Sequence, residues 1–321
     1  MKTITEYSTP MNKNTSLDWC SITKKSQEKI MGTDIFCEII CEPEERGLAK
    51  KALEEAFDFF TSFEKRFSRF KTHNELWELN ESEGGKVSHE LFALLKTARQ
   101  YFYETNGLFD PSILPALESE GYAGAYQNIP GEKQSFSDLI LDTINETATK
   151  PQGLKIDLGG IGKGFAVDML VATLSKHFDH FLIDAGGDIY LRGANKKDGY
   201  SFWAIDIENP LEKETSPATL LLRDTAVATS GINRRSWEKD GEQKHHIIDP
   251  HTQKSSLSDL VTVTVIAPET TRADILAKTL FLKGKQAGLT FANTEHIPAV
   301  FVDQTGKAFF SHAMKPYVWK A

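Results

Sequence analysis

The chain has 321 residues, 40% of them hydrophobic and 26% charged, and a formal net charge of -8 at pH 7. This length and hydrophobic content are sufficient for a buried core, so the composition excludes a disordered chain. An acidic chain lacks the basic surplus expected of general nucleic-acid binders and of binders of anionic membranes, which argues against both classes.

The N-terminal region is polar and aperiodic, so we expect a loosely held tail over 1–28 and a single domain over 29–321. The N-terminus has no apolar core of an export signal, and no apolar run is long enough to span a membrane. On a strand, Cys37 and Cys41 would lie roughly 13 Å apart, too far for a disulfide. These features predict a cytoplasmic protein without membrane insertion.

Hydrophobic periodicity predicts a strand over 34–42 and a helix over about 43–66. Ser88 is expected to cap a second helix that Gly107 ends. In Leu108-Phe109-Asp110-Pro111, the acidic residue before proline is held extended, as occurs both at sites and at plain turns. The segment 118–134 lacks periodicity and is predicted to be a loop able to cover a site.

A glycine-rich stretch at 155–168, K-I-D-L-G-G-I-G-K-G-F-A-V-D, is the most distinctive segment of the chain. The spacing of apolar residues around it predicts a strand, a glycine turn and a helix. Glycines allow close approach of a ligand, and the first helical turn attracts an anion, to which Lys163 adds positive charge. A Walker A loop would need glycine at Asp157 and Ser or Thr at Gly164, and a dinucleotide fingerprint would need glycine at Phe165. Neither motif is present, so the stretch predicts a phosphate site or, alternatively, a tight structural turn.

The second half of the chain is predicted to be rich in strands. A hairpin is expected over 181–191, turning at Ala185-Gly186-Gly187, and further strands at 203–207, 219–222, 226–229 and 261–266. Thr229-Ser230-Gly231 ends one of these strands and places hydroxyl groups where a loop begins.

Two adjacent histidines begin the run H-H-I-I-D-P-H-T at His245. On a strand, His246 and Ile248 would face one way and His245 the other, so one histidine could enter a pocket. Histidine titrates near neutrality and suits proton transfer, although a purely structural histidine is the common alternative.

A helix is predicted to begin near Thr271 and to run through Leu282. Asp274 lies in its first turn, where the helix dipole favours a carboxylate that could also hold Mg²⁺. Lys278 follows four residues later on the same face, and the plain alternative is a solvated ion pair worth under about half a kcal/mol.

Taken together and in this order, these segments resemble the ApbE family, the FAD:protein FMN transferases. The matching pieces are M-G-T at Met31, F-S-R-F at Phe67, L-N at Leu79, N-G-L-F-D-P at Asn106, D-L-G-G-I-G-K-G-F-A-V-D at Asp157, D-A-G-G-D-I at Asp184, A-T-S-G at Ala228, H-H-I-I-D-P-H-T at His245 and A-D-I-L-A-K-T-L-F-L-K-G at Ala273. The resemblance covers about residues 30 to 310. The motifs are specific for the family when taken together, and no single motif is.

The resemblance implies an α+β fold related to the T-fold, with mixed, largely antiparallel sheets flanked by helices around an extended FAD cleft. Members transfer FMN from FAD to a Thr or Ser hydroxyl in a short motif of an acceptor flavoprotein, and release AMP. Carried onto this chain, the residues that would contact the dinucleotide are Met31, Leu108, Phe109, Asp110, Gly159, Lys163, Asp168, Ser230 and Ile247.

His246 would be the catalytic histidine, and Mg²⁺ would be held by the backbone carbonyl of Gly162, by Asp274 and by the side chain four residues later. Many members have Thr at that position, whereas this chain has Lys278, whose charged ammonium cannot ligate a cation. Three alternatives stay open. Thr279 substitutes through a small shift, the metal has fewer protein ligands, or Lys278 takes over part of the role of the cation.

Displacement at phosphorus requires charge neutralisation and positioning, which agrees with a lysine, a metal ion and a histidine at one site. Two other functions use the same ligand. One is a Mg²⁺-dependent FAD pyrophosphatase, in which water replaces the protein hydroxyl, and the other is a non-catalytic flavin-binding protein.

Overall fold

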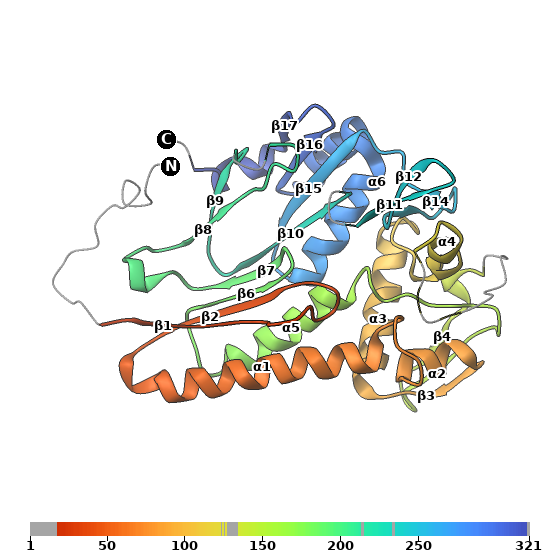
Figure 1. Cartoon of the computed structure of the whole chain (residues 1–321), viewed down its shortest axis with the longest axis horizontal. Coiled ribbons are helices and arrows are strands. Elements are labelled where there is room, and N and C mark those ends of the chain that lie inside the picture. The colour runs from red at the N-terminus through yellow and green to blue at the C-terminus, as the bar shows by residue number, and fades with distance from the viewer. Residues whose placement is uncertain are drawn as a thin grey trace.

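The computed structural model describes residues 18–122, 124, 126, 134–212, 215–232 and 235–319. Its centre is an eight-stranded sheet with the strand order β1-β2-β6-β7-β10-β15-β16-β17 (Figure 1). Every described pairing between neighbouring strands of this sheet is antiparallel. The predicted α+β class with largely antiparallel sheets is therefore confirmed.

The helices and strands have the following bounds. The helices are α1 (Arg46–Phe67), α2 (Glu75–Glu81), α3 (His89–Glu104), α4 (Leu114–Ser119), α5 (Gly162–Leu174) and α6 (Thr270–Thr294). The central strands are β1 (Cys20–Lys25), β2 (Ile35–Cys41), β6 (Phe181–Ala185), β7 (Asp188–Arg192), β10 (Thr225–Gly231), β15 (Leu260–Ala267), β16 (Ala299–Asp303) and β17 (Ala308–Phe310). The smaller sheets are β3 (Gly84–Lys86), β4 (Ile140–Asp142) and β5 (Thr147–Thr149), β8 (Trp203–Asp206) with β9 (Thr219–Leu222), β11 (Ser236–Lys239) with β12 (Glu242–His245), and β13 (Ile248–Asp249) with β14 (Lys254–Ser255).

The central sheet is covered on both faces (Figure 1). Helices α1, α5 and α6 pack on one face, and the β8–β9 hairpin with the 3-10 helix His312–Tyr317 packs on the other. Alternate side chains of a strand point to opposite faces, so Ile39 of β2 joins the core beneath the helices while Ile40 joins the core beneath the hairpin. None of the helices within the described residues combines the length and the apolar character that crossing a bilayer requires.

The predicted tail over 1–28 is wrong for its last part. Strand β1 pairs with β2, from Cys20 opposite Cys41 to Lys25 opposite Phe36, and Ile22 is buried. An edge strand with only one buried face carries few apolar residues, which is why its sequence C-S-I-T-K-K shows no clear alternation. The predicted domain boundary at residue 29 therefore cuts through the sheet, and residues 1–17 lie outside the described part. All three cysteines are free.

The apolar segment before the glycines is not the strand that the sequence predicts. Its backbone bonds to a side chain, since the Ile156 N–H donates to Asn80 Oδ1 at 2.7 Å and Asn80 Nδ2 donates to the Ile156 carbonyl at 2.9 Å. The next N–H, of Asp157, donates to the Pro111 carbonyl at 2.8 Å. A buried asparagine thus replaces the neighbouring strand and aligns the glycine turn. The loop expected over 118–134 lies partly outside the described residues.

Helices α5 and α6 meet through a carboxylate and a glycine. Asp168 of α5 accepts hydrogen bonds from the backbone N–H groups of Thr270 and Thr271, both at 2.8 Å, and from the Thr271 hydroxyl at 2.5 Å. These bonds satisfy N–H groups in the first turn of α6 that have no intrahelical partner. A Cβ at Gly164 would lie 2.8 Å from Thr271 Cα, so only glycine allows this close approach.

Replacement of Asp168 by Ala is expected to lower the free energy of unfolding by about 1–3 kcal/mol, because it removes the cap of α6 and leaves buried donors unpaired. Urea unfolding followed by circular dichroism measures this loss. The matched control is Asp58→Ala on the exposed face of α1, expected to change stability by less than about 0.5 kcal/mol. Equal stability of Asp168→Ala and the parent would contradict the role of the cap.

Candidate active site

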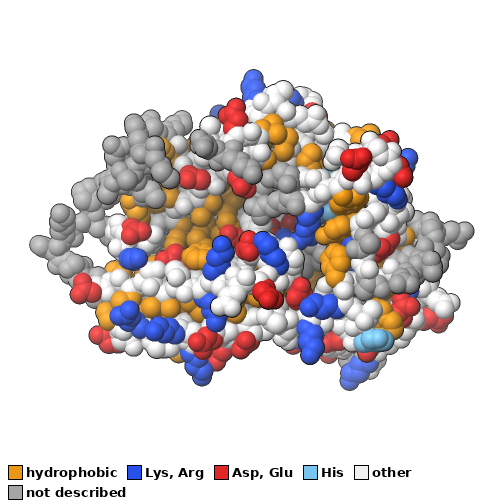
Figure 2. All heavy atoms as spheres, viewed as in Figure 1, with side chains coloured by type: hydrophobic (Ala, Val, Ile, Leu, Met, Phe, Trp, Pro, Cys, Tyr) orange, Lys and Arg blue, Asp and Glu red, His pale blue; other side chains and the backbone are white. Residues whose placement is uncertain are grey.

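A cleft of about 1500 Å³ is lined by segments from most of the chain. Figure 2 shows basic and acidic side chains side by side across the middle of the viewed face, next to a hollow with hydrophobic side chains at its floor. The predicted residues that line the cleft are Met31, Leu108, Phe109, Asp110, Gly159, Gly162, Lys163, Ser230, His246, Ile247 and Asp274. A cleft of this size suits an elongated ligand larger than an ordinary drug-sized molecule.

Two residues predicted for the site do not line this cleft. Asp168 instead caps α6, as described above. The Thr279 hydroxyl is buried and donates to the carbonyl of Ile275 at 2.8 Å. Positions 274 and 278 are one helical turn apart and share a face, whereas position 279 is rotated toward the core. The structure therefore places Thr279 where its hydroxyl cannot serve as a metal ligand at this site.

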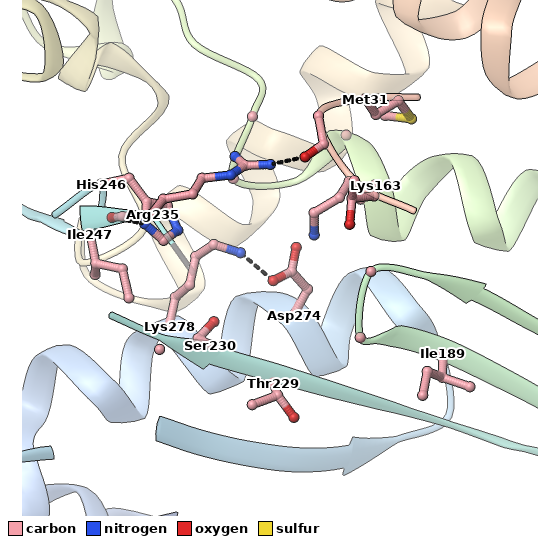
Figure 3. Close-up of a pocket in the computed structure, with 18 of the residues that line it drawn as sticks. Met31, Lys163, Ile189, Thr229, Ser230, Arg235, His246, Ile247, Asp274 and Lys278 are labelled. Carbon is pink, nitrogen blue, oxygen red and sulfur yellow. Dashed lines mark hydrogen bonds and ion pairs between the residues drawn. The ribbon is translucent and has the colours of Figure 1, made fainter. Parts of the chain in front are cut away.

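The Met31–Gly32 pair forms the tip of a two-residue turn. Ile30 and Thr33 exchange backbone hydrogen bonds of 2.9 and 3.1 Å, and Met31 and Gly32 have φ values of 55° and 71°. Positive φ at both central positions is the geometry of a type I′ turn, and it brings Met31 to the cleft. Arg235 Nη2 donates to the Gly32 carbonyl at 3.4 Å, which ties this turn to the opposite wall (Figure 3).

A cluster of two buried or half-buried ion pairs lies at the cleft. Lys163, in the first turn of α5, pairs with Asp188 at the start of β7, and Lys278 pairs with Asp274 on α6. The two carboxylates are almost inaccessible, with 1% exposure for Asp188 and 2% for Asp274. Figure 3 shows Lys163 and Lys278 pointing toward Asp274 from opposite sides. The cluster is thus neutral as a whole while two ammonium groups remain at the cleft wall.

The pKa values in this cluster reflect burial and mutual attraction. Burial raises the pKa of Asp188 above its usual range and the nearby charge of Asp274 adds to this, while Lys163 opposes both. Burial acts to lower the pKa of Lys163, but the attraction of Asp188 and Asp274 is stronger and raises the pKa. Each lysine lies beside a buried carboxylate, so loss of either lysine would leave that carboxylate without its ammonium partner.

The histidine pair does not lie on the continuous strand that the sequence predicts. Strand β12 ends at His245 and β13 begins at Ile248, so His246 and Ile247 lie in the break between them. Ile247 and Ile248 both line the cleft with His246, whereas a strand would turn Ile247 to the opposite face. His245 turns away, with its ring 6.4 Å from that of Phe281. The divergence of the two histidines is as predicted, but a chain bend and not a strand pleat produces it.

His246 is neutral in this setting. Burial lowers its pKa to about 3, and the positive charges of Arg235 and Lys278 contribute to the decrease. Its Nδ1 lies 3.3 Å from the carbonyl oxygen of Arg235, a contact that favours the proton on Nδ1. Nε2 then carries the lone pair and is available as a proton acceptor.

Sequence reasoning missed Arg235 and gave Asp188 no role. Arg235 lines the cleft between Gly32 and His246, where it adds a third cation to the two lysines. A doublet of arginines shortly after a strand, in a chain of net charge -8, was the available signal. For Asp188 the signal was the second acid of D-A-G-G-D-I, which the hairpin turn of β6 and β7 places beside Lys163.

The predicted magnesium site offers few groups suited to the ion. Within the described ranges, no three His, Cys, Asp or Glu side chains are grouped so as to hold a metal ion. Gly162 and Asp274 line the cleft, but the Lys278 ammonium occupies one oxygen of Asp274. The other oxygen, Oδ2, is buried without a hydrogen-bond partner in the described structure. Because one carboxylate already paired with a lysine is a poor donor set for Mg²⁺, the residues present do not fit the ion well.

A cleft in which Lys163, Lys278 and Arg235 gather near a neutral histidine, built on an antiparallel α+β fold, defines a protein that binds and can transfer a phosphate-containing group. The model of the ApbE family matches residues 31–301. The chain belongs to this family.

Similar proteins include the FAD:protein FMN transferase of Treponema pallidum, 30% identical over 267 residues that cover 73% of this chain and 71% of that protein. The FAD:protein FMN transferase of Vibrio cholerae is 29% identical over 286 residues, 84% of this chain and 83% of that protein. The crystal structure of the ApbE protein of Thermotoga maritima matches with a TM-score of 0.81 and 25% identity, over 93% of this chain and 100% of that chain.

Replacement of His246 by Gln is expected to flatten the acid dependence of stability. The folded pKa of His246 lies below its unfolded value near 6.5, so the unfolded chain binds the proton and stability falls as pH drops below about 6.5. Between pH 7 and pH 5 the parent should lose about 2 kcal/mol more unfolding free energy than the variant. Urea unfolding at both pH values measures the difference, with exposed His177→Gln as control. Equal losses in parent and His246→Gln would show that His246 is not held neutral.

Proposed function

We propose that this protein transfers FMN from FAD to a Ser or Thr hydroxyl of an acceptor flavoprotein and releases AMP. The observation that carries the proposal is the convergence of Lys163, Lys278 and Arg235 with neutral His246 on one cleft large enough for a dinucleotide. The FAD:protein FMN transferases of Treponema pallidum and Vibrio cholerae, similar over most of this chain, support the same activity.

The two kinds of cleft wall suit the two parts of FAD. The cationic side chains of Lys163, Lys278 and Arg235 would face the pyrophosphate, whose charge they offset. Apolar walls supplied by Met31, Phe109 and others would take the aromatic parts of the dinucleotide. The ion pairs of the lysines with Asp188 and Asp274 hold the ammonium groups in place before the ligand arrives, so little reorganisation is needed.

In the proposed reaction, the acceptor hydroxyl oxygen attacks the FMN phosphorus of FAD. A P–O bond forms to the acceptor, the bond from that phosphorus to the bridging oxygen of the pyrophosphate breaks, and AMP leaves with the bridging oxygen. The hydroxyl proton passes to His246 Nε2. Lys163, Lys278 and Arg235 offset the charge that develops on the phosphoryl oxygens.

A histidine with a pKa near 3 is a weak base in the free protein. The bound pyrophosphate supplies the missing contribution, because its negative charge opposes the repulsion from Arg235 and Lys278 and raises the pKa of His246. Proton acceptance by His246 is thereby linked to the presence of FAD.

No step above depends on Mg²⁺, because the residues present fit the ion poorly. Of the groups predicted to hold it, the Gly162 carbonyl and Asp274 lie at the cleft, and the Lys278 ammonium already occupies one oxygen of Asp274. The proposed location of the protein is the cytoplasm. The free thiols of Cys20, Cys37 and Cys41 support a reducing compartment such as the cytoplasm.

The direct experiment incubates the purified protein with FAD, Mg²⁺ and a candidate acceptor flavoprotein, and uses mass spectrometry to detect an FMN adduct on Ser or Thr together with AMP. Free FMN and AMP without an adduct would indicate the pyrophosphatase. Tight FAD binding without AMP under every condition would indicate the non-catalytic flavin-binding protein.

Replacement of His246 by Ala is expected to slow FMN transfer by at least about a hundredfold, because the proton acceptor is lost. The dissociation constant for FAD should change by less than about threefold, since the three cations remain. Adduct formation over time and flavin fluorescence titration measure the two quantities, and exposed His177→Ala serves as control. Equal transfer rates in His246→Ala and parent would remove His246 from the mechanism.

A further inference from the structure

The pair between Lys278 and Asp274 differs from an ordinary ion pair on a helix surface. Asp274 is 2% exposed and the Lys278 side chain 19% exposed, and both line the cleft. An exposed pair at this i, i+4 spacing contributes under about half a kcal/mol and tolerates the loss of either partner. In a buried pair, loss of the ammonium leaves an uncompensated charge, so Lys278 is required wherever Asp274 is ionised.

The charges of the cluster are already balanced without a metal ion. Lys163 offsets Asp188 and Lys278 offsets Asp274, and both ammonium groups point toward Asp274 (Figure 3). A divalent cation at Asp274 would have to displace Lys278 or share the carboxylate with two ammonium groups at close range. Either outcome places like charges together in a partly desolvated wall, at a cost that rises as the dielectric falls.

Among the described residues, neither Thr279 nor a group of acidic, histidine or cysteine side chains adds ligands that would favour the ion over the lysine. The hydroxyl of Thr279 is bonded to the Ile275 carbonyl in the helix interior, and the described residues hold no cluster of metal-binding side chains. One buried carboxylate oxygen, Asp274 Oδ2, has no hydrogen-bond partner in the described part of the chain. A single oxygen falls short of the several oxygen ligands that Mg²⁺ takes from protein, substrate and water.

We infer that Lys278 replaces the divalent cation of this site, so that the chain binds FAD without a metal ion. The inference rests on the proposed FAD cleft and concerns how its pyrophosphate is held. The ammonium has three donors, of which Asp274 uses one, so donors remain for phosphate oxygens. Asp274 then acts as a positioning residue that orients Lys278, and not as a metal ligand.

The test measures FAD binding by flavin fluorescence in EDTA and in millimolar Mg²⁺, and Mn²⁺ binding by electron paramagnetic resonance on the same preparations. The parent should show a dissociation constant for FAD that differs by less than about twofold between the two conditions, and no stoichiometric Mn²⁺. Lys278→Thr frees Asp274 and adds a hydroxyl. It should bind FAD at least about tenfold more weakly in EDTA, recover in Mg²⁺, and take up one Mn²⁺ per chain.

Two further variants separate charge from folding. Lys278→Arg keeps a cation and should bind FAD in EDTA within about threefold of the parent, with no Mn²⁺ uptake. Lys283→Thr, on the same helix but outside the residues that line the cleft, is the matched control and should behave as the parent. Both readouts are made on the full chain, and circular dichroism reports the folding of each variant.

A parent that loses FAD in EDTA and regains it in Mg²⁺, or that binds one Mn²⁺ per chain, overturns the inference. A parent that binds no FAD in any condition contradicts the proposed function. The Mn²⁺ spectrum of that same sample still decides whether the lysine excludes the metal, so the two failures are distinguishable.

Discussion

The cluster of two ion pairs, Lys163 with Asp188 and Lys278 with Asp274, is the constraint on which the rest of the site depends. These residues come from α5, β7 and α6. Because a buried carboxylate without its ammonium partner is costly, the three elements must pack in one fixed register. The contact between α5 and α6 provides this register: Gly164 lies next to Lys163, and Thr271 lies one turn before Asp274. Asp168 caps α6 at the same junction. A residue outside the cleft thus helps to position Lys163 and Asp274, which line it.

The cleft combines fixed positive charge with a histidine kept neutral. The like charges of Lys163, Lys278 and Arg235 would ordinarily repel one another, and the pairing of the two lysines with Asp188 and Asp274 stabilises the arrangement before a ligand binds. Burial, with a contribution from the charges of Arg235 and Lys278, lowers the pKa of His246, so the imidazole is a neutral proton acceptor beside the cationic side chains. A bound pyrophosphate would add negative charge and raise the pKa of His246. The histidine would therefore become a better proton acceptor when FAD is present.

Much of the fold and of the site was predictable from the sequence, where local chemistry decides the structure. The long helix ending near Phe67, the Ser88 cap, the hairpin of β6 and β7 and the cleft positions of Met31, Lys163, His246 and Asp274 follow from periodicity, caps and motifs. The errors fall where distant contacts decide. The segment before the glycines forms no strand, because its backbone bonds to the buried Asn80 side chain and not to a neighbouring strand. Residues Cys20–Lys25 form a strand because β2 lies beside them. Asp168 and Thr279 match motif positions. Asp168, however, caps α6, and the helix rotates Thr279 toward the core. Arg235 belongs to no periodic pattern, and only the folded cleft brings it near His246.

The central claim is that a dinucleotide pyrophosphate lies between the two lysines, with His246 facing the phosphorus. A crystal structure of this protein with FAD tests it most directly. The account predicts pyrophosphate oxygens within about 3 Å of the ammonium groups of Lys163 and Lys278, with His246 Nε2 directed at the FMN phosphate. FAD bound elsewhere on the molecule, or bound in the cleft with its pyrophosphate away from both lysines, would contradict the account.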